Sequence, residues 1–139
     1  MRLLIDTNVF LDYLLNREDA NDIELLFSNC VKRKNQIYIT SQSLRDIEYS
    51  AHKHFHDHNL SKNVQMSAYK ICYKVIGISA DAAIESLYSD VDDYEDSLQV
   101  EAAKEALLDC IVTSNKKDFK NCGIAVFTPA ELNDIWSKQ

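Results

Sequence analysis

Short apolar runs alternate with longer amphipathic segments from one end of the sequence to the other. Each run has the length of a buried strand, and together they cover residues 2–5, 37–40, 75–78, 110–113 and 124–127. The intervening segments, such as 20–34, place apolar residues three and four positions apart, as helices do. Strands that alternate with helices form a mainly parallel sheet covered on both faces. The sequence therefore predicts an α/β fold.

Composition favours one domain with few irregular loops. The chain has 139 residues but only 2 glycines and 1 proline, so we expect residues 1–139 to form a single, helix-rich domain. No signal-peptide core is present, and no apolar run approaches the ~20 residues of a membrane span. We expect a cytoplasmic protein without a membrane partner. The four widely spaced cysteines are expected to be reduced and mostly buried.

The negative charge constrains the function. The net charge is −7, and nine acidic residues lie between Asp81 and Glu105. Phosphate contacts need Lys and Arg, so this composition argues against a simple nucleic-acid-binding module. It argues less against a nuclease, because bound divalent ions supply positive charge where the phosphate lies.

Three carboxylates stand where a parallel α/β sheet binds its ligands, beyond the carboxyl ends of the strands. Asp6 ends the first strand, and Glu48 lies on the helix after the second. Asp96 extends the apolar stripe through Val100 and Leu107 of a helix expected over 94–108, so it should be partly buried. A buried carboxylate is costly unless a positive group pairs with it. We expect Asp6, Glu48 and Asp96 to converge on one cation.

The helix after the second strand is expected to begin near Ser41 or Ser43. Asp46 follows Ser43 by three residues, as in a capping box. The apolar stripe of this helix includes Ile47, one position before Glu48. Glu48 therefore lies one position off this stripe.

The chemistry that suits these acids is metal-assisted hydrolysis. Mg²⁺ and Mn²⁺ prefer a few carboxylates together with water and substrate phosphate. Such ions activate a water and stabilise charge on the attacking and leaving oxygens. The sequence offers no Ser-His-Asp arrangement and no Gly-rich phosphate loop, which is consistent with this type of reaction.

Four segments together resemble the motifs of the PIN-domain family, in particular VapC-like toxin ribonucleases. They are residues 3–12 (LLIDTNVFLD), 39–48 (ITSQSLRDIE), 93–99 (DYEDSLQ) and 111–119 (IVTSNKKDF). The resemblance implies a three-layer α/β/α fold with strand order 3-2-1-4-5. It also implies a metal-dependent endoribonuclease that cuts RNA, usually as a toxin held inactive by an antitoxin protein and commonly a homodimer.

By the same resemblance, Asp6, Glu48 and Asp96 are metal ligands, and Thr113 and Asn115 are site positions beside the fourth strand. We assign catalytic roles to Asp6, Glu48, Asp96 and Asn115. The chain departs from the family where many members have an acid in place of Asn115 and an Arg in place of Ser114. Asp118 is therefore proposed as the fourth carboxylate of the metal site.

Several polar residues are candidates for substrate contact: Asn8, Thr113, Lys116, Lys117 and His54. The two lysines would contact phosphate beside the cleft. His54 belongs to four alternating histidines in 52–58, whose i,i+4 spacing also suits a transition metal. Two readings of this segment stay open: an exposed, pH-sensitive helix end, or a surface that contacts RNA.

Other classes of protein fit less well. A haloacid-dehalogenase-like phosphatase also begins with a strand and Asp-x-Asp, but its second Asp would be Asn8, whose amide cannot act as the general acid. A response-regulator receiver needs paired acids after its first strand. The remaining alternative is a degenerate PIN module that only binds a partner.

Overall fold

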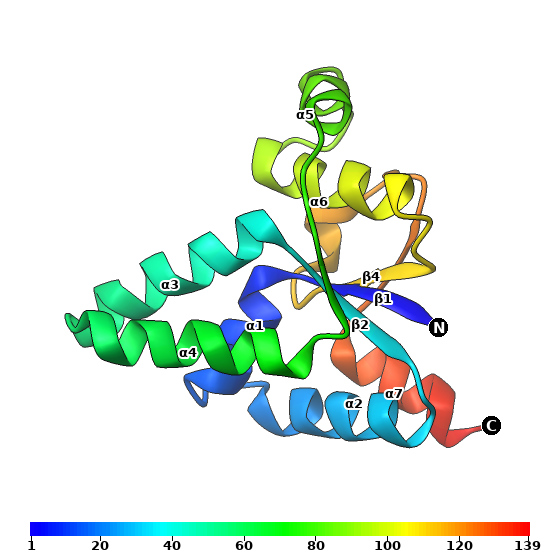
Figure 1. Cartoon of the computed structure of the whole chain (residues 1–139). Coiled ribbons are helices and arrows are strands. Elements are labelled where there is room, and N and C mark those ends of the chain that lie inside the picture. The colour runs from blue at the N-terminus through cyan, green and yellow to red at the C-terminus, as the bar shows by residue number, and fades with distance from the viewer.

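A twisted sheet of five parallel strands forms the centre of the computed structural model, which describes residues 1–139 (Figure 1). Its strands are β1 (Arg2–Ile5), β2 (Gln36–Thr40), β3 (Lys74–Ile76), β4 (Cys110–Val112) and β5 (Ala125–Phe127). The order across the sheet is β3-β2-β1-β4-β5, and every neighbouring pair is parallel. The predicted α/β class and the order 3-2-1-4-5 are therefore confirmed.

Seven α-helices and one short 3₁₀ helix surround the sheet. They are α1 (Thr7–Leu14), α2 (Ala20–Lys32), α3 (Ser41–Phe55), α4 (His58–Ile71), α5 (Ala80–Leu87), α6 (Tyr94–Glu105), η1 (Lys116–Phe119) and α7 (Pro129–Ser137). In Figure 1, α5 and α6 lie on one side of the strands and α2 and α7 on the other, while α3 and α4 run side by side. None of the helices combines the length and apolar character needed to cross a membrane.

Alternation along the strands creates a core on each face of the sheet. Leu3 and Ile5 of β1 point into the larger cluster, which includes Phe10 of α1 and Leu26 of α2. Leu4, between them, points into the smaller cluster beneath α6. Successive strand residues face opposite sides, so one four-residue strand helps to build both cores. These two apolar layers hold the ends of β1 and β4 rigidly beside each other.

Several element boundaries differ from the prediction by one to three residues. The helix expected over 94–108 ends at Glu105, because Leu107 has a φ of 56° and is 78 % exposed. Leu107 therefore does not continue the apolar stripe. The third strand lies at Lys74–Ile76 rather than 75–78.

The start of α3 also differs from the prediction. Thr40 is the N-cap, and its side chain accepts a hydrogen bond from the Ser43 backbone N–H at 3.0 Å. The expected capping box of Ser43 and Asp46 is therefore wrong, because the helix has already begun at Ser41. Asp46 lies in the second turn, which frees its carboxylate for the site.

Candidate active site

Asp6 follows β1 at the point where the strand order reverses, between β1 and β4. It is 8 % exposed. Its Oδ1 accepts a hydrogen bond from the Thr7 backbone N–H at 2.8 Å, and its Oδ2 accepts one from Thr113 Oγ1 at 2.9 Å. Burial raises the pKa of Asp6, while the hydrogen bonds from Thr113, Thr7 and Gln99 oppose the rise. The carboxylate is thus held in one orientation but remains costly to ionise.

Asp96 lies in the first turn of α6, where its backbone N–H donates to the Oδ1 of the N-cap Asp93 at 3.0 Å. Burial, the largest cause, and the negative charges of Asp6, Asp93, Asp118 and Glu95 together raise the pKa of Asp96 to about 7. A helix N-terminus normally favours a carboxylate. Burial and repulsion outweigh that effect here.

Asp6 and Asp96 line the same cleft, which encloses about 300 Å³ at the carboxyl edge of the sheet. The cleft is predominantly polar, and its lining comes from α1, α3 and α6 together with Asp6. The lining residues are Asp6, Thr7, Asn8, Leu11, Gln42, Arg45, Asp46, Tyr49, Ser50, Glu95, Asp96 and Gln99. The expectation that Asp6 and Asp96 lie together agrees with this geometry.

Asp46 lines this cleft, whereas Glu48 does not. Glu48 turns toward α4, where its Oε1 accepts a hydrogen bond from Ser61 Oγ at 3.0 Å and lies 3.5 Å from His58 Nδ1. The hydrogen bond from Ser61 is the main cause of its lowered pKa. Two positions along a helix correspond to about 200°, so Asp46 and Glu48 face nearly opposite sides of α3. This placement corrects the expected convergence of Glu48 with Asp6 and Asp96.

A buried hydrogen-bond network supports the floor of the cleft. Thr40 Oγ1 donates to Gln99 Oε1 at 2.8 Å, and Gln99 Nε2 donates to Ser43 Oγ at 2.9 Å. Ser43 Oγ and Thr7 Oγ1 lie 2.7 Å apart. The network ties the starts of α1, α3 and α6 together, so it fixes the three helices that present the acids.

The predicted residues beside β4 lie behind or next to the cleft. Thr113 is fully buried, and besides donating to Asp6 its hydroxyl accepts a hydrogen bond from the Asn115 backbone N–H at 3.1 Å. The Asn115 side-chain amide donates to Asp118 Oδ2. Asp118 does not line the cleft, yet its charge raises the pKa of both Asp6 and Asp96. It therefore borders the acidic group.

The candidate substrate contacts are dispersed. Asn8 is exposed and lines the cleft. Lys116 forms an ion pair with Glu131 at 3.2 Å and lies outside the cleft lining, whereas Lys117 lines an adjacent recess with Asp118. His54 packs edge-on against Phe55 and does not reach the cleft.

Arg45, Asp46 and Gln99 are among the cleft residues to which the sequence analysis gave no site role. A signal for them exists in the spacing. From Gln42, the cleft-lining positions of α3 follow at i+3, i+4, i+7 and i+8, a single helical face. Gln99 follows Asp96 by three residues on α6 and so shares its face.

A divalent cation fits this donor set. Neither Asp6 nor Asp96 has a Lys or Arg within ion-pair distance, and Asp46 pairs only with the neighbouring Arg45, whose side chain is 72 % exposed. Burying carboxylates together without positive charge is unfavourable. Mg²⁺ retains several of its waters and binds through few carboxylates, so the acids need not be in direct contact. Asp6, Asp46 and Asp96 are the residues positioned to hold it.

Fold and cleft together define the class: an α/β protein whose acidic cleft lies at the switch point of a parallel sheet. The sequence model of the PIN domain matches residues 2–117. The chain therefore belongs to the PIN domain family. A search of curated proteins gave no match.

Several solved structures share this fold, and one of them is described as a toxin–antitoxin complex from Klebsiella pneumoniae. VapBC2 of Rickettsia felis, bound to a promoter DNA fragment, has 21 % identity and a TM-score of 0.64, covering 92 % of this chain and 98 % of its own. DNA-bound VapBC of Salmonella typhimurium has 20 % identity and a TM-score of 0.72, with coverages of 93 % and 98 %. FitAcB of Neisseria gonorrhoeae has 13 % identity and a TM-score of 0.70, with coverages of 92 % and 98 %. At these identities the likeness establishes the fold.

Proposed function

We propose that this chain is a toxin-type endoribonuclease that hydrolyses RNA phosphodiester bonds in the acidic cleft with Mg²⁺ or Mn²⁺. One observation carries the proposal. The carboxylates of Asp6, which is buried, and Asp96, which is half-buried, line the same cleft, and neither forms an ion pair with a basic residue. Membership of the PIN family supports nuclease chemistry and displaces the phosphatase alternative.

The chain's own residues hold the cation and orient the substrate. Asp6, fixed by Thr113, and Asp96 would be its principal ligands, and Asp46 would act in the place expected for Glu48. Asp118, positioned by Asn115, adds negative charge at the border of the cleft. When bound, the cation lowers the pKa of a coordinated water and offsets charge on the phosphoryl oxygens. Hydrolysis joins the water oxygen to phosphorus, breaks one ester P–O bond and leaves a proton on the released hydroxyl.

Basic groups for the RNA backbone lie at the rim of the cleft. Arg45 lines the cleft with an exposed guanidinium, and Lys117 lies in the adjacent recess beside Asp118. Both are placed to contact phosphates that flank the scissile bond. Asn8, exposed at the start of α1, supplies a neutral hydrogen-bonding group on the same side.

The first experiment is cleavage of a set of structured RNAs by the purified chain, separated from any partner. We expect cleavage with MgCl₂ or MnCl₂ and none in EDTA. Asp96→Asn should slow cleavage roughly 100-fold or more, the scale of losing one transition-state-stabilising group. Asp81→Asn, at an exposed position of α5 outside the cleft, is the matched control. Cleavage that persists in EDTA, or no cleavage with either ion, would contradict the proposal; the second result would favour a module that only binds a partner.

We also propose an antitoxin protein as partner and a homodimer as the assembly. The support is the fold shared with VapBC and FitAcB complexes. Co-expression with the protein encoded by the neighbouring reading frame tests the first, and light scattering of the purified chain tests the second. A strictly monomeric chain that captures no neighbour-encoded protein would contradict this assignment.

A further inference from the structure

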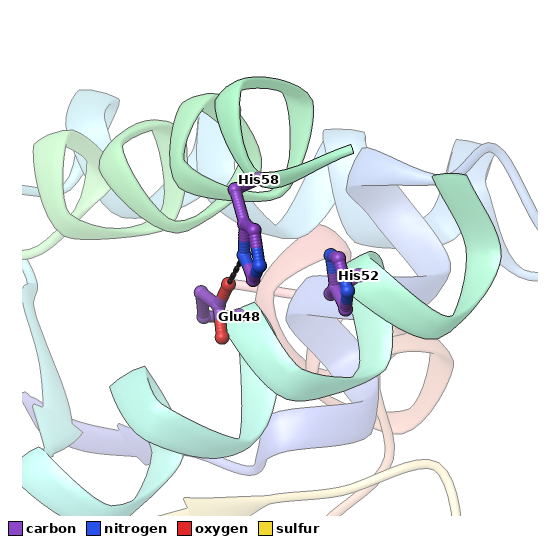
Figure 2. Close-up of side chains that lie close together, drawn as sticks. All are labelled: Glu48, His52 and His58. Atoms are coloured by element: carbon purple, nitrogen blue, oxygen red, sulfur yellow. Dashed lines mark hydrogen bonds and ion pairs between the residues drawn. The ribbon is translucent and has the colours of Figure 1, made fainter. Parts of the chain in front are cut away.

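A second group of ligating side chains lies on the opposite side of α3 from the acidic cleft. Glu48 and His52 stand four residues apart on one face of α3, and His58 is the first residue of α4 (Figure 2). One ligand atom from each lies within 4.8 Å of the other two. It is the only such group of three His, Cys, Asp or Glu residues in the chain.

The turn between α3 and α4 brings the two histidines together. His56 ends α3 in the left-handed region with a φ of 54°, and Asp57 caps α4 by accepting the backbone N–H groups of Asn59 and Leu60. This reversal places the His58 ring parallel to the His52 ring, with a centroid separation of 3.9 Å and an interplanar angle of 6°. His54 and His56 are not part of the group.

The polar atoms of this group are incompletely satisfied. His52 Nδ1 is buried and has no hydrogen-bond partner, and a buried polar atom in that state is unfavourable. Glu48 has no Lys or Arg partner; its Oε1 lies 3.5 Å from His58 Nδ1. The fully buried Ser61 donates from Oγ to the same oxygen at 3.0 Å. Such a hydrogen bond is what orients a ligating carboxylate in metal sites.

We propose that Glu48, His52 and His58 form a binding site for a transition-metal cation such as Zn²⁺, distinct from the acidic cleft. Two imidazoles and one carboxylate suit Zn²⁺, whereas Mg²⁺ prefers oxygen ligands alone. Three protein ligands leave a fourth position for water. The site joins α3 to α4, so bound Zn²⁺ stabilises the α3–α4 hairpin.

To accept the ion, the ligand atoms must move closer and one imidazole must turn, because stacked rings direct their in-plane nitrogen lone pairs parallel to each other and not toward a common point. Ligand atoms about 2 Å from a tetrahedral zinc lie about 3.4 Å from one another, which is less than the observed limit of 4.8 Å. The His58 side chain is 74 % exposed and free to change rotamer, while Ser61 holds Glu48. Zinc binding therefore requires movement mainly of His58.

Calorimetric titration with ZnCl₂, carried out on the full chain in excess MgCl₂, tests the site while the hard cation occupies the acidic cleft. We expect one Zn²⁺ per chain and at least tenfold weaker binding in the double variant His52→Ala, His58→Ala. His54→Ala, which removes a histidine of the same segment, should bind like the wild type. Circular dichroism of each variant confirms that it is folded.

Histidine side-chain NMR of the same samples locates the ion. Zn²⁺ should shift the ring signals of His52 and His58 and leave those of His54 and His56 in place. Unchanged affinity in the double variant would overturn the proposal, as would loss of Zn²⁺ binding in Asp96→Asn with the histidines intact. RNA cleavage with Mg²⁺ is measured separately, so failure of this site and failure of the proposed nuclease are distinguishable.

Discussion

Asp6 and Asp96 hold their carboxylates in different surroundings. Asp6 is more deeply buried, but Thr113 and Thr7 donate to its two oxygens. The charge of Asp96 is opposed by burial and by four neighbouring acids, which explains why its pKa lies near 7. At the residue scale, the carboxylates of the cleft therefore repel one another, and a bound cation would reduce this repulsion.

This repulsion gives a pH dependence to the metal-free protein. Because the pKa of Asp96 rises from 3.8 to about 7 on folding, the folded chain binds the proton more tightly. The protonated Asp96 carboxyl thus contributes to the stability of the folded chain at low pH, and this contribution is lost as pH rises through about 7. Asp96→Asn removes this dependence. In EDTA, the free energy of unfolding should fall more steeply with pH for the wild type than for the variant. Between acidic and mildly alkaline pH the difference should be about 2 kcal/mol, because solvent screens part of the interaction.

Urea unfolding of both proteins over this pH range measures the difference. Asp81→Asn serves as the control, because Asp81 is exposed in the first turn of α5. Parallel pH profiles for the wild type and Asp96→Asn would contradict the pKa assigned to this carboxyl.

At the scale of elements, α3 carries two polar faces with separate roles. Gln42, Arg45 and Asp46 face the acidic cleft, while Glu48 and His52 face α4. The helical twist decides this division, because two positions along α3 differ by about 200° around its axis. One side of the helix is assigned to RNA hydrolysis and the other to the proposed zinc site.

The two acids of α3 give a direct comparison. Asp46→Asn should slow RNA cleavage roughly 100-fold, because it removes a carboxylate of the cleft. Glu48→Gln should slow RNA cleavage far less: the fold-reduction in rate should be at least ten times smaller than that caused by Asp46→Asn. Single-turnover cleavage with MgCl₂ measures both. A larger loss in Glu48→Gln than in Asp46→Asn would restore Glu48 as the catalytic acid.

Most elements were predictable because strands and helices leave local signals. The apolar run of residues 2–5 and the spacing within α2 identified β1 and α2 closely. Asp6 was found because it ends a strand, and Asp96 because it continues the apolar spacing of Val100 on the same helix. Asp46 was missed because it was assigned to a capping box with Ser43, and Glu48, only two positions further along the helix, faces about 200° away from it.

At the scale of the whole molecule, the order of the strands places the acids together. β1 and β4 are adjacent although more than a hundred residues separate Leu3 from its partner Cys110. No local pattern encodes this pairing; it came from the resemblance to the PIN family and is confirmed by the sheet. The Thr40–Gln99 hydrogen bond likewise joins residues 59 positions apart and was not predictable from spacing.

The account depends on the acidic cleft binding a divalent cation, and Mn²⁺ binding followed by electron paramagnetic resonance tests this most directly. The titration uses the His52→Ala, His58→Ala background, so that the proposed zinc site does not contribute. We predict binding in this background and in its Asp81→Asn derivative, and affinity lower by roughly tenfold or more in its Asp96→Asn derivative. Equal Mn²⁺ affinity with and without the Asp96 carboxylate would contradict the account.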